Sequence, residues 1–172
     1  MAGLGTLAVA GALPDNSLAA TLPESLSAWL VGTWTLESFT STDDRGVTTD
    51  AMGAGATGYL SYSADGWMSV QLMRAGRKPF RVSDMDGGTL EQTVDAARSY
   101  FAYAGPYTVD ETASVVYHNL VFSLMPNWVG GKQKRYARKL GNDELELSGD
   151  PVLIAGKMQT NRLRWRRRAA KE

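Results

Sequence analysis

The chain contains no cysteine and only one histidine among its 172 residues. The absence of cysteine excludes disulfides, thiolate-bound zinc, iron–sulfur clusters and a cysteine nucleophile, and it fits a reducing compartment. A single imidazole offers too few nitrogen ligands for a transition-metal site, so we expect no metal and no metal-based cofactor. The fold must therefore be held by packing alone.

The sequence also lacks an excess of charge of either sign, because 18 Lys and Arg balance 18 Asp and Glu. No overall field then favours nucleic acid, an anionic membrane or a strongly charged substrate. The basic run Arg162–Arg168 has the composition of a nucleic-acid patch, but Leu163 and Trp165 alternate with its charges. That alternation is typical of a last barrel strand with arginines outside or stacked across Trp34. We expect no nucleic-acid partner.

A long apolar run of membrane-spanning length is missing as well. Met1–Leu13 is apolar but is soon followed by Pro14, and a transmembrane helix takes about 20 apolar residues. No basic residue precedes Arg45, so the positive region of a secretory signal is absent. We therefore expect residues 1–22 to be a flexible extension of a cytoplasmic protein with no membrane partner.

The length suits one domain, and the 44% of apolar residues can supply its core. We place this domain at residues 23–168, followed by a short tail at 169–172. About eight strand-like runs recur in it, the number that closes a small ligand-sized barrel. These runs are Val31–Ser41, Thr57–Ala64, Trp67–Arg74, Tyr107–Asp110, Ser114–Leu124, Lys132–Leu140, Glu144–Ser148 and Thr160–Arg166. The turn signals Ala64-Asp65-Gly66 and Gly141-Asn142-Asp143 predict antiparallel neighbours.

The first run predicts how one end of the barrel is closed. Trp34, Leu36 and Ser38 share one face of that strand, and Trp34 is expected to plug the barrel end. Just before it, Pro23-Glu24-Ser25 leads into apolar residues at helical spacing, Leu26, Trp29 and Leu30. This pattern predicts a short helix with proline in its first turn that caps a barrel end.

The segment Thr89–Tyr103 breaks the strand pattern. Its apolar residues fall on one helical stripe, formed by Leu90, Val94, Ala97 and Phe101. Thr89 and Gln92 have capping-box spacing, and Gly105-Pro106 is expected to stop the helix. We expect this inserted helix to act as a plug or lid, with its stripe turned toward the barrel wall or mouth.

Two further motifs carry no cofactor prediction. Gly53–Gly58 matches G-x-G-x-x-G, but a dinucleotide fingerprint must open a helix, whereas this loop leads into the strand Tyr59–Tyr62. The acidic pairs Asp43-Asp44 and Asp84/Asp86 lack calcium-loop spacing and are interpreted as solvated turns. We expect neither nucleotide nor other cofactor.

Residues that could carry chemistry lie on the predicted strands. His118 shares a face with Val116, Leu120 and Phe122. A histidine among apolar neighbours is more often a hydrogen-bonded group of the core than a catalyst. Because the usual pKa of histidine is close to neutral, His118 is still the best candidate for proton transfer. If Gln133 or Arg135 points into the barrel, it could orient a carbonyl or stabilise an enolate of the substrate. The alternative is that this strand is exposed and its charged side chains face solvent.

For the strands at 57–64 and 67–74, two readings remain open. Either the polar-aromatic face lines the pocket, or the face with Leu60, Tyr62, Met68, Val70 and Leu72 packs inside. With the first reading, the predicted substrate-binding residues are Tyr59, Trp67, Ser69, Gln71, Tyr103, Asn119, Trp128 and Gln133. The predicted catalytic residues are His118, Arg135, Tyr107 and Tyr117.

The sequence resembles the lipocalin-like domain proteins of bacteria and fungi over residues 27–166. The resemblance lies in Leu30–Phe39, Gly58–Tyr62, Asp65–Val70, Tyr103–Tyr107, Gln133 with Arg135, and the V-x-H pattern Val116-Tyr117-His118. It implies an all-β, antiparallel, eight-stranded barrel with one inserted helix and a short N-terminal helix. Some related small barrels of biosynthetic gene clusters act as cofactor-free cyclases or isomerases.

We therefore favour a cofactor-independent cyclase or isomerase that acts on a small hydrophobic biosynthetic intermediate, polyketide- or terpenoid-like, held inside the barrel. The alternative is a non-catalytic carrier of a small hydrophobic molecule, and a third interpretation is a structural interaction protein whose barrel is filled by side chains. The sequence leaves a homodimer open and does not name the substrate.

Overall fold

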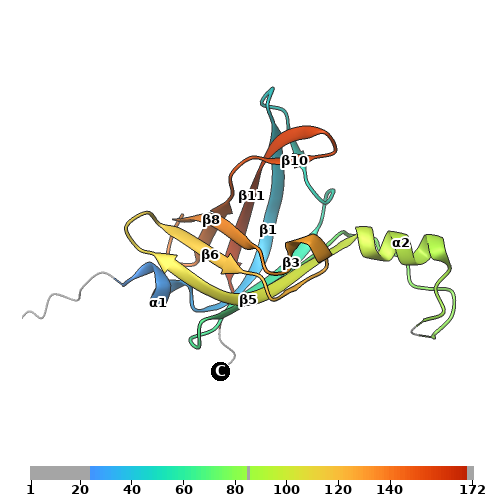
Figure 1. Ribbon diagram of the computed structural model, residues 1–172, viewed down its shortest axis with the longest axis horizontal. Helices are drawn as coiled ribbons and strands as arrows, with labels where there is room; N and C mark the ends of the chain where they lie inside the picture. Colours follow the sequence, from blue (N-terminus) through green and yellow to red (C-terminus); the bar gives the residue numbers. More distant parts are fainter. Residues whose placement is uncertain (1–23, 85, 170–172) are drawn as a thin grey trace, which may run out of the picture.

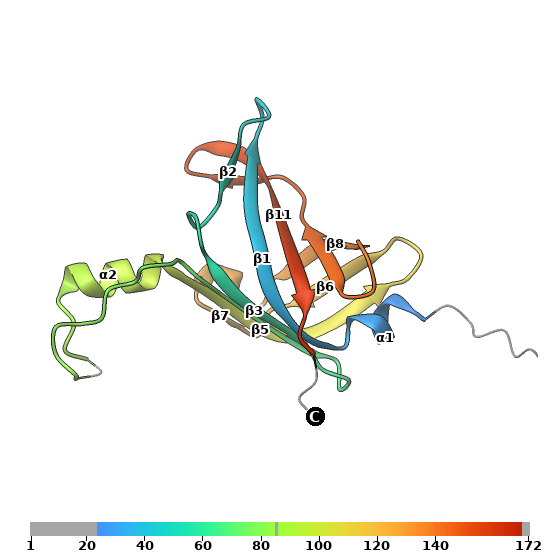
Figure 2. The ribbon, with the colours of Figure 1, turned by 180° about the vertical axis from the view of Figure 1, so that it is seen from behind.

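The computed structural model describes residues 24–84 and 86–169, which form a closed antiparallel β-barrel (Figures 1 and 2). Eight strands make the wall in the order β1-β3-β4-β5-β6-β8-β9-β11, and pairing of β11 with β1 closes it. Their bounds are β1 Gly32–Asp43, β3 Thr57–Tyr62, β4 Trp67–Met73, β5 Tyr100–Asp110, β6 Val115–Asn119, β8 Lys132–Lys139, β9 Glu144–Ser148 and β11 Lys157–Arg167. The predicted fold class is confirmed. The predicted extension at 1–22, Pro23 and residues 170–172 lie outside the described residues.

Three short strands flank this wall. β2 (Thr48–Asp50) pairs with β1, β10 (Val152–Ile154) pairs with β11, and β7 (Phe122–Ser123) pairs with β5. In Figure 2, β1 and β11 rise well above the rest of the barrel, and β2 and β10 lie beside their upper ends. The strands β2 and β10 therefore extend one end of the barrel.

The run predicted as one strand at 114–124 is split after Asn119. The carbonyl oxygen of Asn119 lies so close to β5 that a Cβ added to Gly105 would be 1.9 Å from it. Only glycine permits this approach, and the chain then continues as β7. Phe122 is consequently 64% exposed, so the expectation that it shares the face of His118 is wrong.

A β-bulge halfway along β1 reverses which of its alternate side chains point into the barrel. The register with β11 shifts between Leu36 and Ser38, which places one extra residue on the β1 side. Trp34 and Leu36 point into the core before the bulge, whereas Phe39 packs against the core after it. Ser38 therefore does not share the face of Trp34, contrary to the expectation from strict alternation.

The end of the barrel next to Trp34 is closed as predicted. Helix α1 (Leu26–Leu30) begins after Ser25, whose side chain accepts the N–H of Ala28. The indole N–H of Trp34, which is fully buried, donates to the carbonyl of Leu30 at 2.9 Å. The Arg167 guanidinium lies 4.1 Å from the centre of the Trp34 ring, so a C-terminal arginine does stack across Trp34.

Helix α2 (Leu90–Arg98) does not cover the barrel. It begins with the predicted capping box, in which Thr89 and Gln92 each bond the other's backbone N–H. The helix then projects sideways from the wall (Figures 1 and 2), leaving Leu90 82% and Val94 39% exposed. The expectation that these two side chains face the barrel wall or mouth is wrong.

The helix also ends earlier than predicted. Ser99 is its C-cap, and residues from Tyr100 onward pair with β4, including Phe101 with Leu72 and Tyr103 with Val70. Aromatic side chains suit a half-buried pleated surface, so pairing to a wall strand overrides the helical period here. Tyr103 is thereby part of the wall.

On the outer face of the wall, three arginines surround one buried carboxylate. Glu146 in β9 is 4% exposed; it accepts from Arg138 at 2.8 Å and from Arg164 at 3.3 Å, and Arg162 lies at 3.7 Å. Burial by itself raises the pKa of Glu146, but the hydrogen bonds and charges of these arginines outweigh it and hold the pKa below its usual value. The folded state therefore binds this proton less readily than the unfolded chain, and the stabilisation is lost as pH falls through the folded pKa.

Replacing Glu146 by glutamine should lower the free energy of unfolding by about 1–3 kcal/mol at neutral pH. The difference from the wild type should shrink in acid, because the wild-type carboxyl then also loses its charge. Urea unfolding measured across the acidic range checks this. Glu37→Gln, at a more exposed ion pair with Arg166, should cost less than about 1 kcal/mol. Equal losses in the two variants would contradict the prediction.

Candidate functional site

The barrel encloses a cavity of about 660 Å³. Ligand cavities for small molecules span roughly 300–1,000 Å³, so its volume is that of a binding site and not of a packing defect. Most of its lining is apolar or aromatic, including Phe39, Met52, Leu60, Val70, Leu72, Phe101, Tyr103, Trp128, Leu147, Leu163 and Trp165. The barrel is therefore not filled by its own side chains.

The cavity lies away from the end that α1 closes. Its lining includes Ala97 and Arg98 from the last turn of α2, Trp128 from the short 3-10 helix η1 (Pro126–Trp128), and the strand β10. Leu153 of β10 is 70% exposed although it also lines the cavity, so this strand forms part of the rim.

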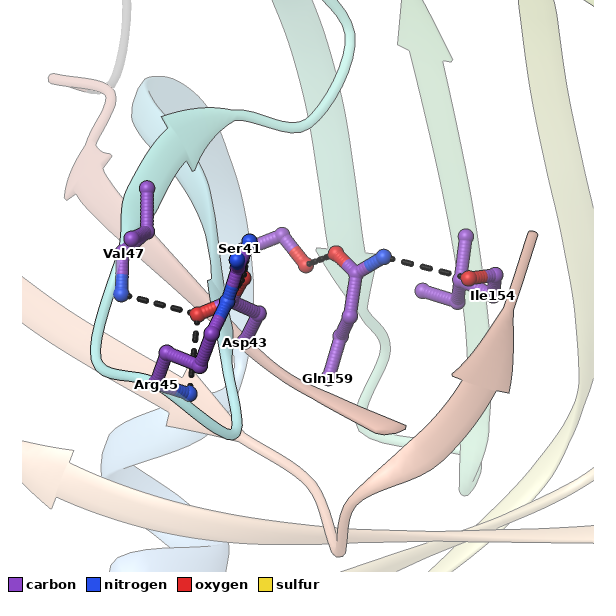
Figure 3. Close-up of polar contacts among 6 residues, drawn as sticks. All are labelled: Ser41, Asp43, Arg45, Val47, Ile154 and Gln159. Atoms are coloured by element: carbon purple, nitrogen blue, oxygen red, sulfur yellow. Dashed lines mark hydrogen bonds and ion pairs between the residues drawn. The ribbon is translucent and has the colours of Figure 1, made fainter. Parts of the chain in front are cut away.

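Side-chain hydrogen bonds tie the strands at this rim together (Figure 3). Ser41 of β1 donates to Gln159 Oε1 of β11 at 2.5 Å, and Gln159 Nε2 donates to the carbonyl of Ile154 in β10 at 3.2 Å. In the neighbouring β1–β2 turn, the Asp43 carboxylate accepts two backbone N–H groups. These bonds hold β10 beside the ends of β1 and β11.

His118 lies in the wall of the cavity between two tyrosines. Its Nε2 is 2.8 Å from the Tyr62 hydroxyl, and its Nδ1 is 3.2 Å from the Tyr103 hydroxyl. Tyr103 and His118 line the cavity, whereas Tyr62 lies behind them in the core. A neutral imidazole has one donor and one acceptor nitrogen, so one tyrosine donates to the ring and the other accepts from it.

Burial governs the protonation of this group. It lowers the pKa of His118 well below the usual 6.5, and the charge of Arg135 lowers it further. It also raises the pKa of Tyr62 well above 10, with a smaller contribution from Tyr103. Both shifts favour the neutral forms, so the site holds an uncharged imidazole beside the uncharged phenol of Tyr62.

Strand β8 brings a charge into the cavity. Gln133 and Arg135 point inward, paired with His118 and Val116 of β6, and both line the cavity. Arg135 Nη1 donates to the carbonyl of Lys134 at 3.0 Å. Within the described residues, no carboxylate lies within ion-pairing distance of Arg135.

Strand β11 contributes two polar atoms that have no hydrogen-bond partner within the described residues. They are Nε1 of Trp165, a residue 1% exposed, and Oδ1 of Asn161. Both residues line the cavity. A buried donor or acceptor without a partner costs about 1–3 kcal/mol, so each of these two atoms lacks a hydrogen bond that would stabilise it.

The structure brings five of the predicted site residues to the cavity: His118, Arg135, Tyr103, Trp128 and Gln133. It places the others elsewhere. Tyr59, Trp67, Ser69, Gln71, Asn119 and Tyr117 do not line the cavity. On β3 and β4 the apolar set, which includes Leu60 and Val70, points inward instead. Of the two readings left open for these strands, the first, with the polar-aromatic face lining the pocket, is therefore wrong, and the second holds.

The two tyrosines predicted as catalytic donors are also displaced from the cavity. Tyr117 lies on the other side of β6 from His118, with the Lys132 ammonium 5.3 Å from its ring centre. Tyr107 packs against Tyr62 at 4.8 Å, and its hydroxyl donates to the Ser63 carbonyl. Neither hydroxyl reaches the cavity, so neither can act as a fixed donor there.

Sequence reasoning missed two polar residues of the site, Tyr62 and Asn161. Tyr62 belongs to the apolar face of the second open reading, but nothing in the sequence pairs it with His118. Asn161 has the same strand parity as Leu163 and Trp165, so the alternation on the last strand was a signal that could have found it.

The described residues hold no group of three or more carboxylate, imidazole or thiol side chains arranged to bind a metal ion. No helix in this part of the chain is both long and apolar enough to cross a membrane.

A fungal carrier protein and two designed β-barrels are among the known proteins that this chain is similar to. A 4'-hydroxy-3'-methoxypropiophenone carrier protein of Aspergillus oryzae is 38% identical over 107 residues, which cover 58% of this chain and 96% of that protein. Among solved structures, a redesigned β-barrel (15% identity, 85% of this chain and 100% of that chain) and a de novo designed fluorescence-activating β-barrel (10% identity, 84% and 99%) each give a TM-score of 0.40. The sequence pattern of the lipocalin-like domain matches residues 31–168, and the chain belongs to this family.

Proposed function

We propose that this protein binds a small, largely apolar aromatic molecule inside its barrel and carries it without changing it. The observation that supports this most directly is the cavity of about 660 Å³, whose largely apolar lining includes two residues, Asn161 and Trp165, that each carry a buried polar atom without a partner among the described residues. Apolar walls with few, well-placed polar groups are the usual composition of small-molecule sites.

The polar groups suggest what the molecule carries. The Trp165 N–H can donate to a carbonyl or ether oxygen, and Asn161 Oδ1 can accept from a hydroxyl. The aromatic walls at Trp128 and Phe101, whose rings meet edge to face at 5.3 Å, suit a flat ring. An aryl ketone with a ring hydroxyl has all three features, and the Aspergillus relative is named as the carrier of such a molecule.

The test is binding of 4'-hydroxy-3'-methoxypropiophenone, measured by calorimetry and by tryptophan fluorescence. Trp128 and Trp165 line the cavity, so the bound ketone should change the emission. Leu163→Trp should fill the cavity and weaken binding at least about tenfold, or about 1.4 kcal/mol. Val47→Trp introduces the same side chain at an exposed position outside the cavity and should bind as the wild type does.

Chromatography after incubation should recover the ketone unchanged. Failure of the wild type to bind this ketone, or binding that Leu163→Trp leaves intact, would contradict a carrier of such molecules in this cavity.

A second function, cofactor-free isomerisation or cyclisation, is favoured by one observation. Tyr103 lines the cavity and its hydroxyl contacts His118, which contacts Tyr62 in turn, so a proton given by Tyr103 to a substrate could be replaced through the imidazole. Arg135 could then stabilise an enolate oxygen. The pKa shifts oppose this route, because burial disfavours both an imidazolium at His118 and a phenolate at Tyr62. We therefore place carriage before catalysis.

A further inference from the structure

Arg135 carries a positive charge into a largely apolar cavity. Its Nη1 donates to the Lys134 carbonyl at 3.0 Å and approaches Gln133 Oε1 at 3.4 Å, both uncharged acceptors. Its Nε and Nη2 donate to no other group in the part of the chain that the structure describes. Placing a charge against apolar walls costs free energy unless an opposite charge meets it.

The charged residues of the lining do not supply that opposite charge. They are Arg98, Arg135 and Asp150. The Asp150 carboxylate accepts the Tyr136 hydroxyl at 2.7 Å and lies 3.8 Å from the Lys134 ammonium, so it is already engaged on the side of β8 that carries these two residues. The charge that the cavity presents to a ligand is therefore positive.

The place of Arg135 depends on a glycine. Tyr136 pairs with Ser148 of β9, so one step further along the ladder Gly149 lies level with Arg135. A Cβ added to Gly149 would be 3.1 Å from Arg135 Nη1, closer than side chains normally approach. The backbone of Gly149 has no left-handed conformation to explain the residue. The missing side chain leaves room for the guanidinium to lie across the strand.

The geometry points to an acidic ligand: Arg135, given room by Gly149, receives the anionic group of an apolar molecule with one carboxylate or ionised phenol. The inference rests on the proposed function, because it names the chemistry of the molecule held in the same cavity. Gly149 acts as a positioning residue, while Arg135 contacts the ligand. The charge of Arg135 reaches the neighbouring groups, since it also lowers the pKa of His118.

Two fluorescent probes with the same skeleton test this: 8-anilinonaphthalene-1-sulfonate, which is anionic, and N-phenyl-1-naphthylamine, which lacks the sulfonate. The wild type should bind the sulfonate at least about tenfold more tightly than the neutral amine. Arg135→Gln should remove that preference and leave the affinity for the amine unchanged. Gly149→Val should reduce the preference, since its side chain displaces the guanidinium.

Three controls make the result specific. Arg138→Gln makes the same chemical change on the outer face of β8 and should keep the preference. Arg98→Gln removes the rim arginine and should also keep it. Leu163→Trp should weaken both probes, which shows that they occupy the cavity. Melting temperatures of all variants establish that they are folded.

The outcomes separate the two proposals. If both probes bind the cavity equally well, or if Arg98→Gln and not Arg135→Gln removes the preference, the inference is wrong while binding in the barrel stands. If neither probe binds, the cavity is not an aromatic-molecule site and the proposed function fails with it.

Discussion

Replacement of Trp34 by alanine is expected to lower the free energy of unfolding by about 3–5 kcal/mol, the range for a fully buried large aromatic residue. The side chain is fully buried at the closed end of the barrel. The Trp29 ring lies 5.0 Å away, the Arg167 guanidinium packs on the indole at 4.1 Å, and the indole N–H bonds the Leu30 carbonyl. Alanine would remove all of these contacts and leave a cavity beneath α1.

Urea unfolding followed by circular dichroism measures this loss. Trp67→Ala is the matched control, because Trp67 is 41% exposed on the outer face of β4, and its loss should be much smaller. Trp34→Phe retains most of the packing and removes only the N–H donor, so it should fall between the two and remains measurable if Trp34→Ala does not fold. Similar losses for Trp34→Ala and Trp67→Ala would refute the role of Trp34 as the plug of the barrel.

The part of the fold that sequence predicted is the part that local pattern encodes. Strand-like runs located the wall strands except the first part of β5, and the glycine-containing turns gave their antiparallel order. The capping box at Thr89 placed the start of α2 within one residue. Each of these signals lies in residues that are close together in the sequence, so one sequence is enough to detect it.

The misplaced features depend on contacts between distant segments. The bulge near Glu37 exchanges the faces of β1, and it arises from pairing with β11, more than a hundred residues later. The end of α2 is set by pairing of Tyr100 with Met73. Leu90 and Val94 of α2 follow the pattern of a buried helix face, yet both side chains are exposed among the described residues.

The site was predictable in part, because His118 interrupts an apolar face and Gln133 and Arg135 share one face of a polar strand. His118, Gln133 and Arg135 lie on strands whose inward direction was left open, and the structure resolves that choice toward the cavity. On β3 and β4 the apolar face packs inside and the polar face is outside, as alternation usually implies for antiparallel strands. The contacts of His118 with Tyr62 and Tyr103 join three different strands, so no local pattern predicts them.

His118→Ala is expected to destabilise the fold by about 1–3 kcal/mol for each tyrosine hydroxyl that loses its partner. Tyr62 and Tyr103 both bond the imidazole, and all three side chains are buried. The pKa of His118 in the folded state lies well below 6.5, because burial disfavours the imidazolium and Arg135 repels it. Below about pH 6.5 the His118 imidazole is protonated in the unfolded chain but stays neutral in the folded protein. The free energy of unfolding of the wild type therefore declines as pH falls through that range.

His118→Gln should remove this histidine-dependent decline while retaining a hydrogen-bonding side chain between the tyrosines. Urea unfolding of the wild type, His118→Ala and His118→Gln across pH 5–8 measures both effects. A wild-type stability that rises as pH falls from 8 to 5 would contradict a neutral, buried imidazole.

The same variants separate a carrier from an enzyme. An acid–base residue contributes about 100- to 10,000-fold to turnover, so a catalytic His118 would show that loss per folded molecule in His118→Gln. Tyr103→Phe, which removes the hydroxyl of a cavity-lining residue, would share the loss, whereas Tyr62→Phe, behind the imidazole, would retain the first proton donor. For a carrier, we expect every variant to return the bound ketone unchanged, with affinity following the folded fraction. Turnover by the wild type that His118→Gln and Tyr103→Phe abolish in folded protein would overturn carriage and establish the imidazole as part of a proton relay.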